Sequence, residues 1–259
     1  MIRAAITAIL LAMLCAPAPA SALTMQETPS LAADVAAGKL PPVTSRVPTD
    51  PEIVPFDGKQ RVVGKFGGDL RMLIARAQDV RWLQVYGYAR LVVYDTNYAI
   101  KPDILQSIEV KDNRVFTMHL RPGMKWSDGQ PFTTEDFRYW WEDVANNAEL
   151  SPTGPPDELL VNGEPPKVEI LDPLTVRYSW NKPNPFFLPR LAGAFPLYIY
   201  RPAHYLKQFH IKYADKDKLA QLAAAANKHN WAALHNSLDN MYASNNPDLP
   251  SLDPWVVIT

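Results

Sequence analysis

The chain has 259 residues, 47% of them hydrophobic, and this length suffices for one or two domains with a substantial core. Its formal net charge is -1 at pH 7 and no block of basic residues occurs, which argues against nucleic acid or an anionic membrane as a partner. The 25 prolines against 11 glycines favour fixed turns over long uninterrupted helices.

The N-terminus is organised like an export signal. Arg3 precedes the apolar run 4–16, and residues 20–22 (Ala-Ser-Ala) supply the small side chains that a signal peptidase reads. The apolar run is too short to span a membrane permanently. We therefore expect residues 1–22 to be a signal peptide that is cleaved after Ala22, which gives a periplasmic protein with no direct membrane insertion.

The single cysteine, Cys15, lies inside this leader. A lipoprotein would carry its lipid there, but Leu14 is large where a small residue should precede the modified cysteine. Cleavage after Ala22 is therefore favoured over lipidation. The mature protein would then contain no cysteine and form no disulfide.

The next segment is rich in alanine and proline. Residues 23–58 predict an extended lead-in with little regular structure, apart from a short helix over 31–38. A turn at 67–69 (Gly-Gly-Asp) follows, and the run 70–75 predicts a strand. The aromatic-rich stretch 82–93 predicts a helix or loop that leads into a buried element.

Two hairpins follow in the sequence pattern, with a short helical turn before the first. Phe116, Met118 and Leu120 alternate with polar residues, so one face of their strand should be buried. The expected segments are the helical turn 102–106, the strands 108–110 and 115–120, and the strands 168–171 and 175–180.

A helix start is predicted at Thr133, which forms a capping-box pattern with Asp136. Apolar residues then recur at the i, i+3, i+4 and i+7 spacing of one helix face, from Phe137 to Val144. Further helices are expected over 186–192, from 202 to 208, and over 216–240 with an interruption at 227–230.

The segment 120–137 (LRPGMKWSDGQPFTTEDF) resembles the signature of the family-5 extracellular solute-binding proteins of ABC importers. The resemblance runs from about Gly67 to Trp255. Shorter similar stretches keep the family's order at 98–107, 171–176, 182–185 and 202–206. The resemblance implies an α/β fold, the first lobe of a two-lobe periplasmic-binding-protein (type II) architecture that closes on its ligand.

The family's members are longer, and the resemblance implies that residues 59–259 are an incomplete solute-binding domain, its N-terminal lobe. The implied function is periplasmic binding of a small solute, expected to be a peptide, for import through the membrane permease of an ABC transporter. Two alternatives stay open. The chain could be a truncated, non-binding remnant of such a receptor, or an exported hydrolase.

Five residues are candidates for ligand binding. They follow the predicted strand 70–75, where α/β sheets place ligand contacts, and they combine aromatic walls with charged anchors. Core packing is the alternative role for the aromatic members, because buried aromatic side chains are common. The candidates are Asp79, Arg81, Trp82, Tyr86 and Tyr88.

The signature residues themselves are expected to be structural, because turn formation, packing and helix capping already account for each residue type. The residues concerned are Trp126, Ser127, Asp128, Gly129, Pro131, Thr133 and Asp136.

No catalytic or metal-binding motif was found. The five histidines have no histidine partner four residues on, and the sequence has no H-E-x-x-H, C-x-x-C, G-x-S-x-G or phosphate-binding loop. The acidic pairs 135–136 and 142–143 are sequence neighbours that point in different directions on a helix. We therefore expect a binding protein with no catalytic residues, no metal and no cofactor.

Overall fold

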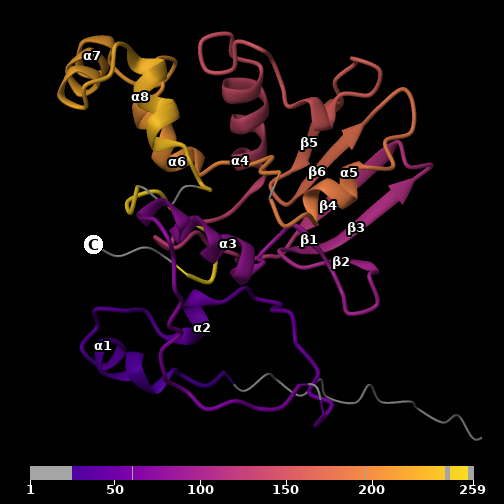
Figure 1. Cartoon of the computed structure of the whole chain (residues 1–259), viewed down its shortest axis with the longest axis vertical. Coiled ribbons are helices and arrows are strands. Elements are labelled where there is room, and N and C mark those ends of the chain that lie inside the picture. Colours follow the sequence, from indigo (N-terminus) through magenta and orange to yellow (C-terminus); the bar gives the residue numbers. More distant parts are fainter. Residues whose placement is uncertain (1–24, 60, 196, 243–245, 256–259) are drawn as a thin grey trace, which may run out of the picture.

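The computed structural model describes residues 25–59, 61–195, 197–242 and 246–255. This part of the chain is an α/β structure with a four-stranded antiparallel sheet, in the order β3-β4-β6-β5, and a small β1-β2 sheet (Figure 1). The strands are β1 (Val92–Tyr94), β2 (Ile100–Pro102), β3 (Leu105–Lys111), β4 (Val115–Leu120), β5 (Lys167–Asp172) and β6 (Thr175–Ser179). The expected signal peptide lies outside the described residues.

Both predicted hairpins are confirmed. Strands β3 and β4 pair with Ile108 opposite Met118, and β5 pairs with β6 with Ile170 opposite Val176. The two hairpins join because β4 also pairs with β6, which places Met118 opposite Val176 in the middle of the sheet. Alternation along the central strands buries Phe116, Met118 and Val176 on one face, as a half-buried sheet requires.

The helices are short. The α-helices are α1 (Ala32–Ala36), α2 (Val43–Arg46), α3 (Trp82–Gly87), α4 (Thr134–Arg138), α5 (Phe187–Leu191), α6 (Ala203–Leu206), α7 (Lys216–Ala225) and α8 (Trp231–Leu238). Helices α4 and α5 lie beside the sheet, α7 and α8 lie at the upper end of the view, and α1 and α2 lie at its lower end (Figure 1). The other helical turns are η1 (Pro29–Leu31), η2 (Ala77–Arg81), η3 (Tyr139–Ala145), η4 (Asp157–Leu159) and η5 (Lys207–Phe209). None of the helices in the described ranges is long and apolar enough to cross a membrane.

The predicted capping box is present at the start of α4. The Thr133 hydroxyl accepts a hydrogen bond from the Glu135 amide at 3.3 Å, and Oδ2 of Asp136 accepts one from the Thr133 amide at 3.0 Å. These bonds satisfy amide groups that the first helical turn leaves without partners. The helix continues through η3, a π-helical segment, and buries Trp140 and Val144.

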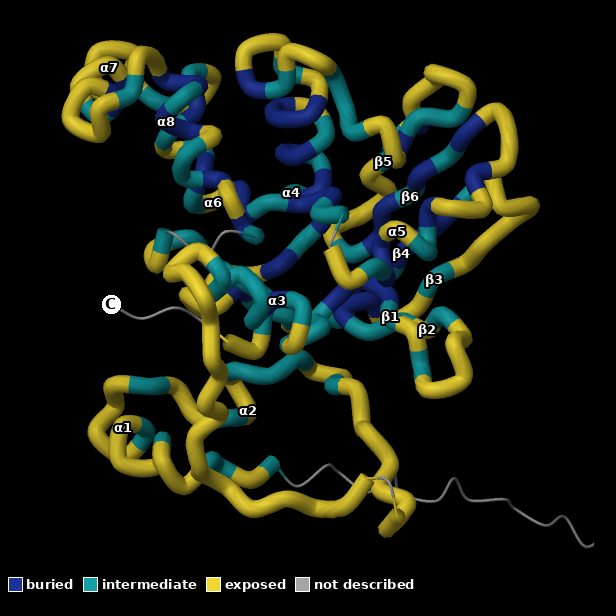
Figure 2. The backbone as a smooth tube through the Cα atoms, in the orientation of Figure 1, coloured by how far each residue is buried: buried dark blue, intermediate teal, exposed yellow. Residues whose placement is uncertain are grey.

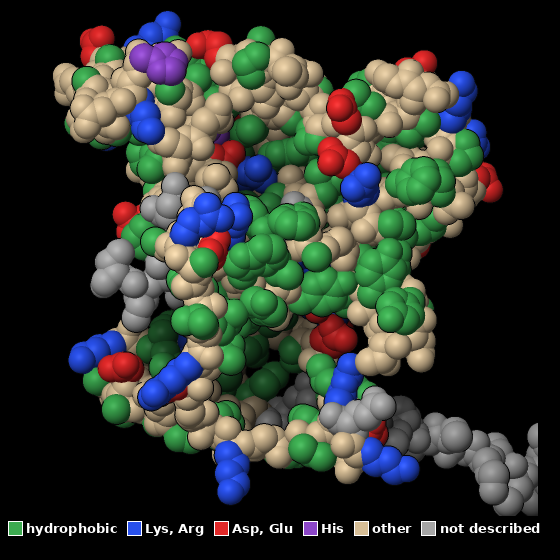
Figure 3. Space-filling view, in the orientation of Figure 1, with side chains coloured by type: hydrophobic (Ala, Val, Ile, Leu, Met, Phe, Trp, Pro, Cys, Tyr) green, Lys and Arg blue, Asp and Glu red, His purple; other side chains and the backbone are tan. Residues whose placement is uncertain are grey.

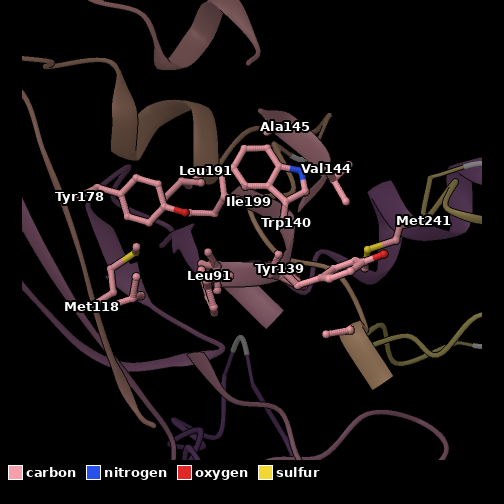
Figure 4. Packing of buried hydrophobic residues seen from close by; sticks show 14 of the residues in the cluster. Leu91, Met118, Tyr139, Trp140, Val144, Ala145, Tyr178, Leu191, Ile199 and Met241 are labelled. Atoms are coloured by element: carbon pink, nitrogen blue, oxygen red, sulfur yellow. The ribbon is translucent and has the colours of Figure 1, made fainter. Parts of the chain in front are cut away.

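Buried residues are concentrated on α4 and on the inner strands β4 and β6, whereas the lead-in is largely exposed (Figure 2). The core holds many aromatic rings, and Figure 4 shows Tyr139, Trp140 and Tyr178 packed among aliphatic side chains. Phe187 of α5 packs on Phe116 of β4, with ring centroids 5.0 Å apart. The sheet and its covering helices therefore share one aromatic core.

Two sequence predictions were wrong. Residues 70–75 form no strand but an exposed chain, because no neighbouring strand in the described structure supplies the hydrogen-bond partners a strand needs. Residues 102–106 form no helical turn. The amides of Ile104 and Leu105 donate to the carbonyls of Arg90 and Leu91, and these long-range bonds hold the segment extended as it enters β3.

The lead-in contacts the rest of the chain near the signature turn. The amide of Thr49 donates to the Pro122 carbonyl at 2.9 Å, and Nζ of Lys125 donates to the Ser45 carbonyl. The helix predicted over 31–38 is present as α1. Hydrogen bonds from both backbone and side-chain donors thus hold the lead-in against the rest of the chain.

A buried histidine gives the fold a pH dependence. His235 of α8 is 0% exposed and shares a 2.7 Å hydrogen bond between its Nε2 and the Tyr139 hydroxyl. Burial lowers the pKa of His235 to about 3, and the nearby His210 and Arg201 act in the same direction. An unfolded histidine takes up its proton below about pH 6.5, so acid favours the unfolded state between these two values.

We expect the free energy of unfolding to fall by about 2–3 kcal/mol between pH 6.5 and 4.5 through this residue alone. Urea denaturation at both pH values, compared between the wild type and His235→Asn, measures this contribution. The exposed His229 provides the control substitution, His229→Asn. An equal pH dependence in wild type and His235→Asn would contradict the assignment.

Candidate functional site

The five candidate ligand-binding residues lie in or beside α3, which follows directly on η2. The helix ends at Tyr88, whose φ of 49° is left-handed and whose amide donates to the Gln84 carbonyl at 3.3 Å. This short helical unit projects its side chains on the face that Figure 3 shows as rich in hydrophobic side chains. The preceding segment is not a strand, so the unit does not follow a sheet as expected.

Two of the five residues make hydrogen bonds that support the fold. Oδ2 of Asp79 accepts a hydrogen bond from the Arg76 amide at 3.1 Å, which caps η2. The Tyr88 hydroxyl donates to the Ala192 carbonyl at 2.7 Å and accepts from the Tyr94 amide at 3.2 Å. These contacts fix both ends of the helical unit.

A buried cation, which the sequence did not single out, anchors the same unit. Arg90 is 2% exposed, and its guanidinium donates to the carbonyls of Gln84 at 2.9 Å, Gly193 at 3.3 Å and Ala194 at 3.1 Å. Its Nη1 also donates to the Ala89 carbonyl at 2.7 Å. The end of α3 is thereby held against the loop that follows α5.

The loop carries Phe195, which completes an aromatic cluster with Trp82 and Tyr242. Ring centroids of Trp82 and Phe195 are 6.1 Å apart, and those of Phe195 and Tyr242 are 5.7 Å apart. Phe195 remains 65% exposed, so the cluster presents aromatic surface to solvent. Such partly exposed rings are suited to stacking against a flat or apolar part of a solute.

Arg81 lies against this aromatic cluster. The centre of its guanidinium is 5.9 Å from the centroid of the Trp82 ring and 6.0 Å from that of Tyr242. These distances permit cation–π attraction to both rings. The cluster therefore combines exposed aromatic surface with one positive charge.

Two cavities adjoin the cluster. One, of about 250 Å³, is bounded by Trp82, Tyr86 and the exposed segment 72–75. The other, of about 710 Å³, contains Tyr242 in its wall together with Trp140 and Tyr198. The larger volume lies within the range of about 300–1,000 Å³ that is usual for sites that hold small molecules.

The larger cavity also has a charged wall. Nε of Arg201 lies 2.5 Å from Oδ1 of Asp239, and Nη1 of Arg201 donates to the carbonyls of Tyr198 and Tyr200. Burial raises the pKa of Asp239 to about 6, while Arg201 acts in the opposite direction. The two opposite charges compensate each other, so this wall offers polarity without a large net charge.

The signature residues occupy a different place. Trp126 is buried, and its Nε1 donates to Oδ2 of Asp136 at 3.2 Å. Oδ1 of Asp128 accepts from the Gln130 amide at 3.0 Å, and Gly129 has a φ of 86° that suits glycine in this turn. Ser127 exchanges backbone and side-chain hydrogen bonds with Ser251. The remaining signature residues are Pro131, which forms an isolated antiparallel β-bridge with Lys125, and Thr133, which is the N-cap of α4.

The region around α3 and the larger cavity brings together groups of the kinds that line binding sites. Aromatic rings, one unpaired cation and a compensated ion pair can hold a solute by stacking and polar contacts. In the described ranges, no group of three or more His, Cys, Asp or Glu side chains is arranged to hold a metal ion.

Solved structures define the class of protein. An oligopeptide-binding protein OppA matches 92% of this chain with a TM-score of 0.78 and 35% identity. The periplasmic binding protein MelB of Agrobacterium fabrum, solved with stachyose, matches 92% with a TM-score of 0.68 and 24% identity. The chain covers 36% of each of these structures. Its fold is therefore that of one part of a periplasmic binding protein.

Sequence comparisons give the family. The periplasmic α-galactoside-binding protein of Rhizobium meliloti is 26% identical over 86% of this chain, and OppA of Salmonella typhimurium is 31% identical over 38%. The chain spans 32% of the length of the first relative and 20% of the length of the second. The model of the bacterial extracellular solute-binding proteins, family 5 (middle region), matches residues 99–236, more than half of the chain. The chain belongs to this family.

Proposed function

We propose that this chain provides part of the solute-contacting surface of an exported receptor for an ABC importer. The observation that carries the proposal is the aromatic cluster of Trp82, Phe195 and Tyr242 beside a cavity of about 710 Å³. Family membership supports the same role, because the named relatives are binding proteins. The receptor would deliver its solute to a membrane permease and carry out no chemical reaction on it.

The proposed location is the periplasm. Relatives of this family are periplasmic binding proteins by name, and the leader pattern of residues 1–22 supports export with cleavage after Ala22. Mass spectrometry of the N-terminal peptide from the exported protein tests the cleavage. A peptide that begins at Leu23 is the expected result.

Two solute classes have specific support. A peptide is favoured by the OppA structure, which is 35% identical and covers nearly all of this chain. An α-galactoside is favoured by the Rhizobium meliloti relative, whose alignment covers 86% of the chain. Stacking on Trp82 and Phe195 would serve either class, since both rings present apolar faces. We propose the peptide as the solute and the α-galactoside as the second candidate.

Ligand-dependent thermal unfolding tests the function. The protein is purified in the length in which its own cells make it, and its melting temperature is measured with tetra-alanine and with stachyose. At a ligand concentration of 100 times Kd, binding stabilises the folded state by about 2.7 kcal/mol. We therefore expect the melting temperature to rise by roughly 5–10 °C with the preferred solute.

The variant Trp82→Ala removes one ring of the cluster and should weaken binding by about tenfold or more, whereas Tyr98→Ala, an 87% exposed ring on the β1–β2 turn, should leave it unchanged. A rise in melting temperature with tetra-alanine alone supports a peptide receptor. A rise in melting temperature with stachyose alone supports a galactoside receptor. If neither solute class nor a wider panel shifts the transition, receptor function is rejected in favour of the non-binding remnant.

A further inference from the structure

Arg81 differs from the other half-buried or buried arginines of the site in how its charge is balanced. Arg201 is paired with Asp239 at 2.5 Å, and Arg90 donates to four backbone carbonyls. For Arg81, by contrast, the residues that the structure describes supply no ion pair, and its Nε is buried without a hydrogen-bond partner. A buried donor in this state costs free energy until it meets an acceptor.

The surroundings of Arg81 favour an incoming anion. The rings of Trp82 and Tyr242 lie within 6.0 Å of its guanidinium. A guanidinium attracted to aromatic rings uses none of its N–H groups in that contact, so they can still donate to an acceptor. The Tyr242 hydroxyl is also buried with no partner in the described part of the chain, and it supplies a second donor beside the same cavity wall.

Arg81 contacts residues that line both cavities. Trp82 belongs to the wall of the smaller cavity and Tyr242 to that of the larger one, and Arg81, which is in neither wall itself, lies within 6.0 Å of both rings. A solute stacked on the aromatic cluster would reach this guanidinium with its end group. A carboxylate fits the two parallel N–H donors of arginine, which a neutral hydroxyl group does not.

We propose that Arg81 binds the carboxylate of the solute and thereby selects peptides with a free C-terminus over neutral sugars. This inference rests on the proposed receptor function and names the chemical class of its solute. Arg81 acts as a specificity residue, while the aromatic cluster supplies affinity that does not depend on charge.

The test compares tetra-alanine with its C-terminal amide by isothermal titration calorimetry, using the protein in the length its cells make. The wild type should bind the free acid about tenfold or more tightly than the amide, which corresponds to a charge-assisted hydrogen-bonded contact. Arg81→Gln should reduce this ratio to near one, and Arg81→Lys should keep part of it, because lysine retains the charge but loses the paired donors.

Arg71→Gln is the matched control. Arg71 is highly exposed and lies 3.4 Å from Asp69, so this variant changes the net charge equally and should keep the wild-type ratio. The inference is overturned if Arg81→Gln keeps the preference for the free acid. It is also overturned if the wild type binds stachyose but neither peptide, an outcome that leaves the receptor function standing. Absence of binding to every probe would instead reject the receptor function itself.

An acidic group elsewhere in the receptor is the competing partner for Arg81. In that case Arg81→Gln would lower the unfolding free energy without ligand and leave the ratio of free acid to amide unchanged. Urea denaturation of the ligand-free variant, run beside the calorimetry, separates this outcome from solute recognition.

Discussion

Replacement of Arg90 by methionine is expected to lower the free energy of unfolding by about 3–5 kcal/mol. The side chain is 2% exposed and donates to the carbonyls of Gln84, Ala89, Gly193 and Ala194. Methionine has a similar length but no donor, so these carbonyls would lose their charged partner in a buried place. Each hydrogen bond to a charged group contributes roughly 1.5–3 kcal/mol, and relaxation of the loop recovers part of the loss.

The same substitution should disturb the candidate site, because Arg90 holds the end of α3 against the loop that carries Phe195. Urea denaturation followed by the fluorescence of the chain's seven tryptophans measures the stability. Arg71→Met is the control at an exposed arginine and should change stability by less than about 0.5 kcal/mol. Equal stabilities for Arg90→Met and wild type would show that the carbonyls find other partners.

The substitution Asp136→Asn is expected to lower the free energy of unfolding by about 3 kcal/mol, although it replaces only one side-chain oxygen by an NH₂ group. Oδ1 of Asp136 accepts from the Ala203 amide at 3.0 Å, and Oδ2 accepts from the Thr133 amide and from Nε1 of Trp126. An asparagine has to turn its NH₂ group toward one of these oxygen positions, where it meets one or two N–H donors. At least one buried donor is then left without an acceptor.

Burial raises the pKa of Asp136 to about 6, and the three donors oppose this effect. The carboxylate is therefore the main form at neutral pH, where the comparison is made. Asp128→Asn is the matched control, because the exposed Asp128 lies in the same signature and its turn geometry is also favoured by asparagine. In urea denaturation at pH 7.5, Asp128→Asn should lower the free energy of unfolding by less than about 1 kcal/mol, whereas Asp136→Asn should lower it by about 3 kcal/mol. Similar losses for the two would contradict a special role for the buried acid.

Elements that depend on local signals could be predicted from the sequence. The capping box at Thr133 and the alternation along 115–120 act within a few residues, and both are present as expected. The interruption between α7 and α8 was likewise marked by polar residues at 227–230. In each case the local preference agrees with the final packing.

The candidate site was only partly predictable. Its aromatic and charged residues at 81–86 could be found because they cluster in the sequence, and Arg81, Trp82 and Tyr86 adjoin the cavities or the aromatic cluster. Phe195, Tyr242 and Arg90 could not be found, because their roles depend on contacts between segments far apart in the chain. Single-sequence patterns contain no information on which distant segments meet.

The strand predicted over 70–75 illustrates the opposite error. Its apolar residues have the composition of a strand, but a strand also requires a neighbour for its amide and carbonyl groups. In the described structure these residues belong to no strand and are exposed, with Leu73 fully accessible. Composition alone thus predicted a strand that the packing does not support.

The hydrogen bonds from Arg90 to the carbonyls of Gly193 and Ala194 have a consequence for the order of folding. They join residues 103 and 104 positions apart, whereas each hairpin of the sheet closes a short loop. Closing a longer loop costs more chain entropy, and contacts of high sequence separation slow folding. We expect the hairpins to form early and the aromatic cluster to assemble late, so that the folding chain acquires its sheet before it acquires the proposed surface for the solute.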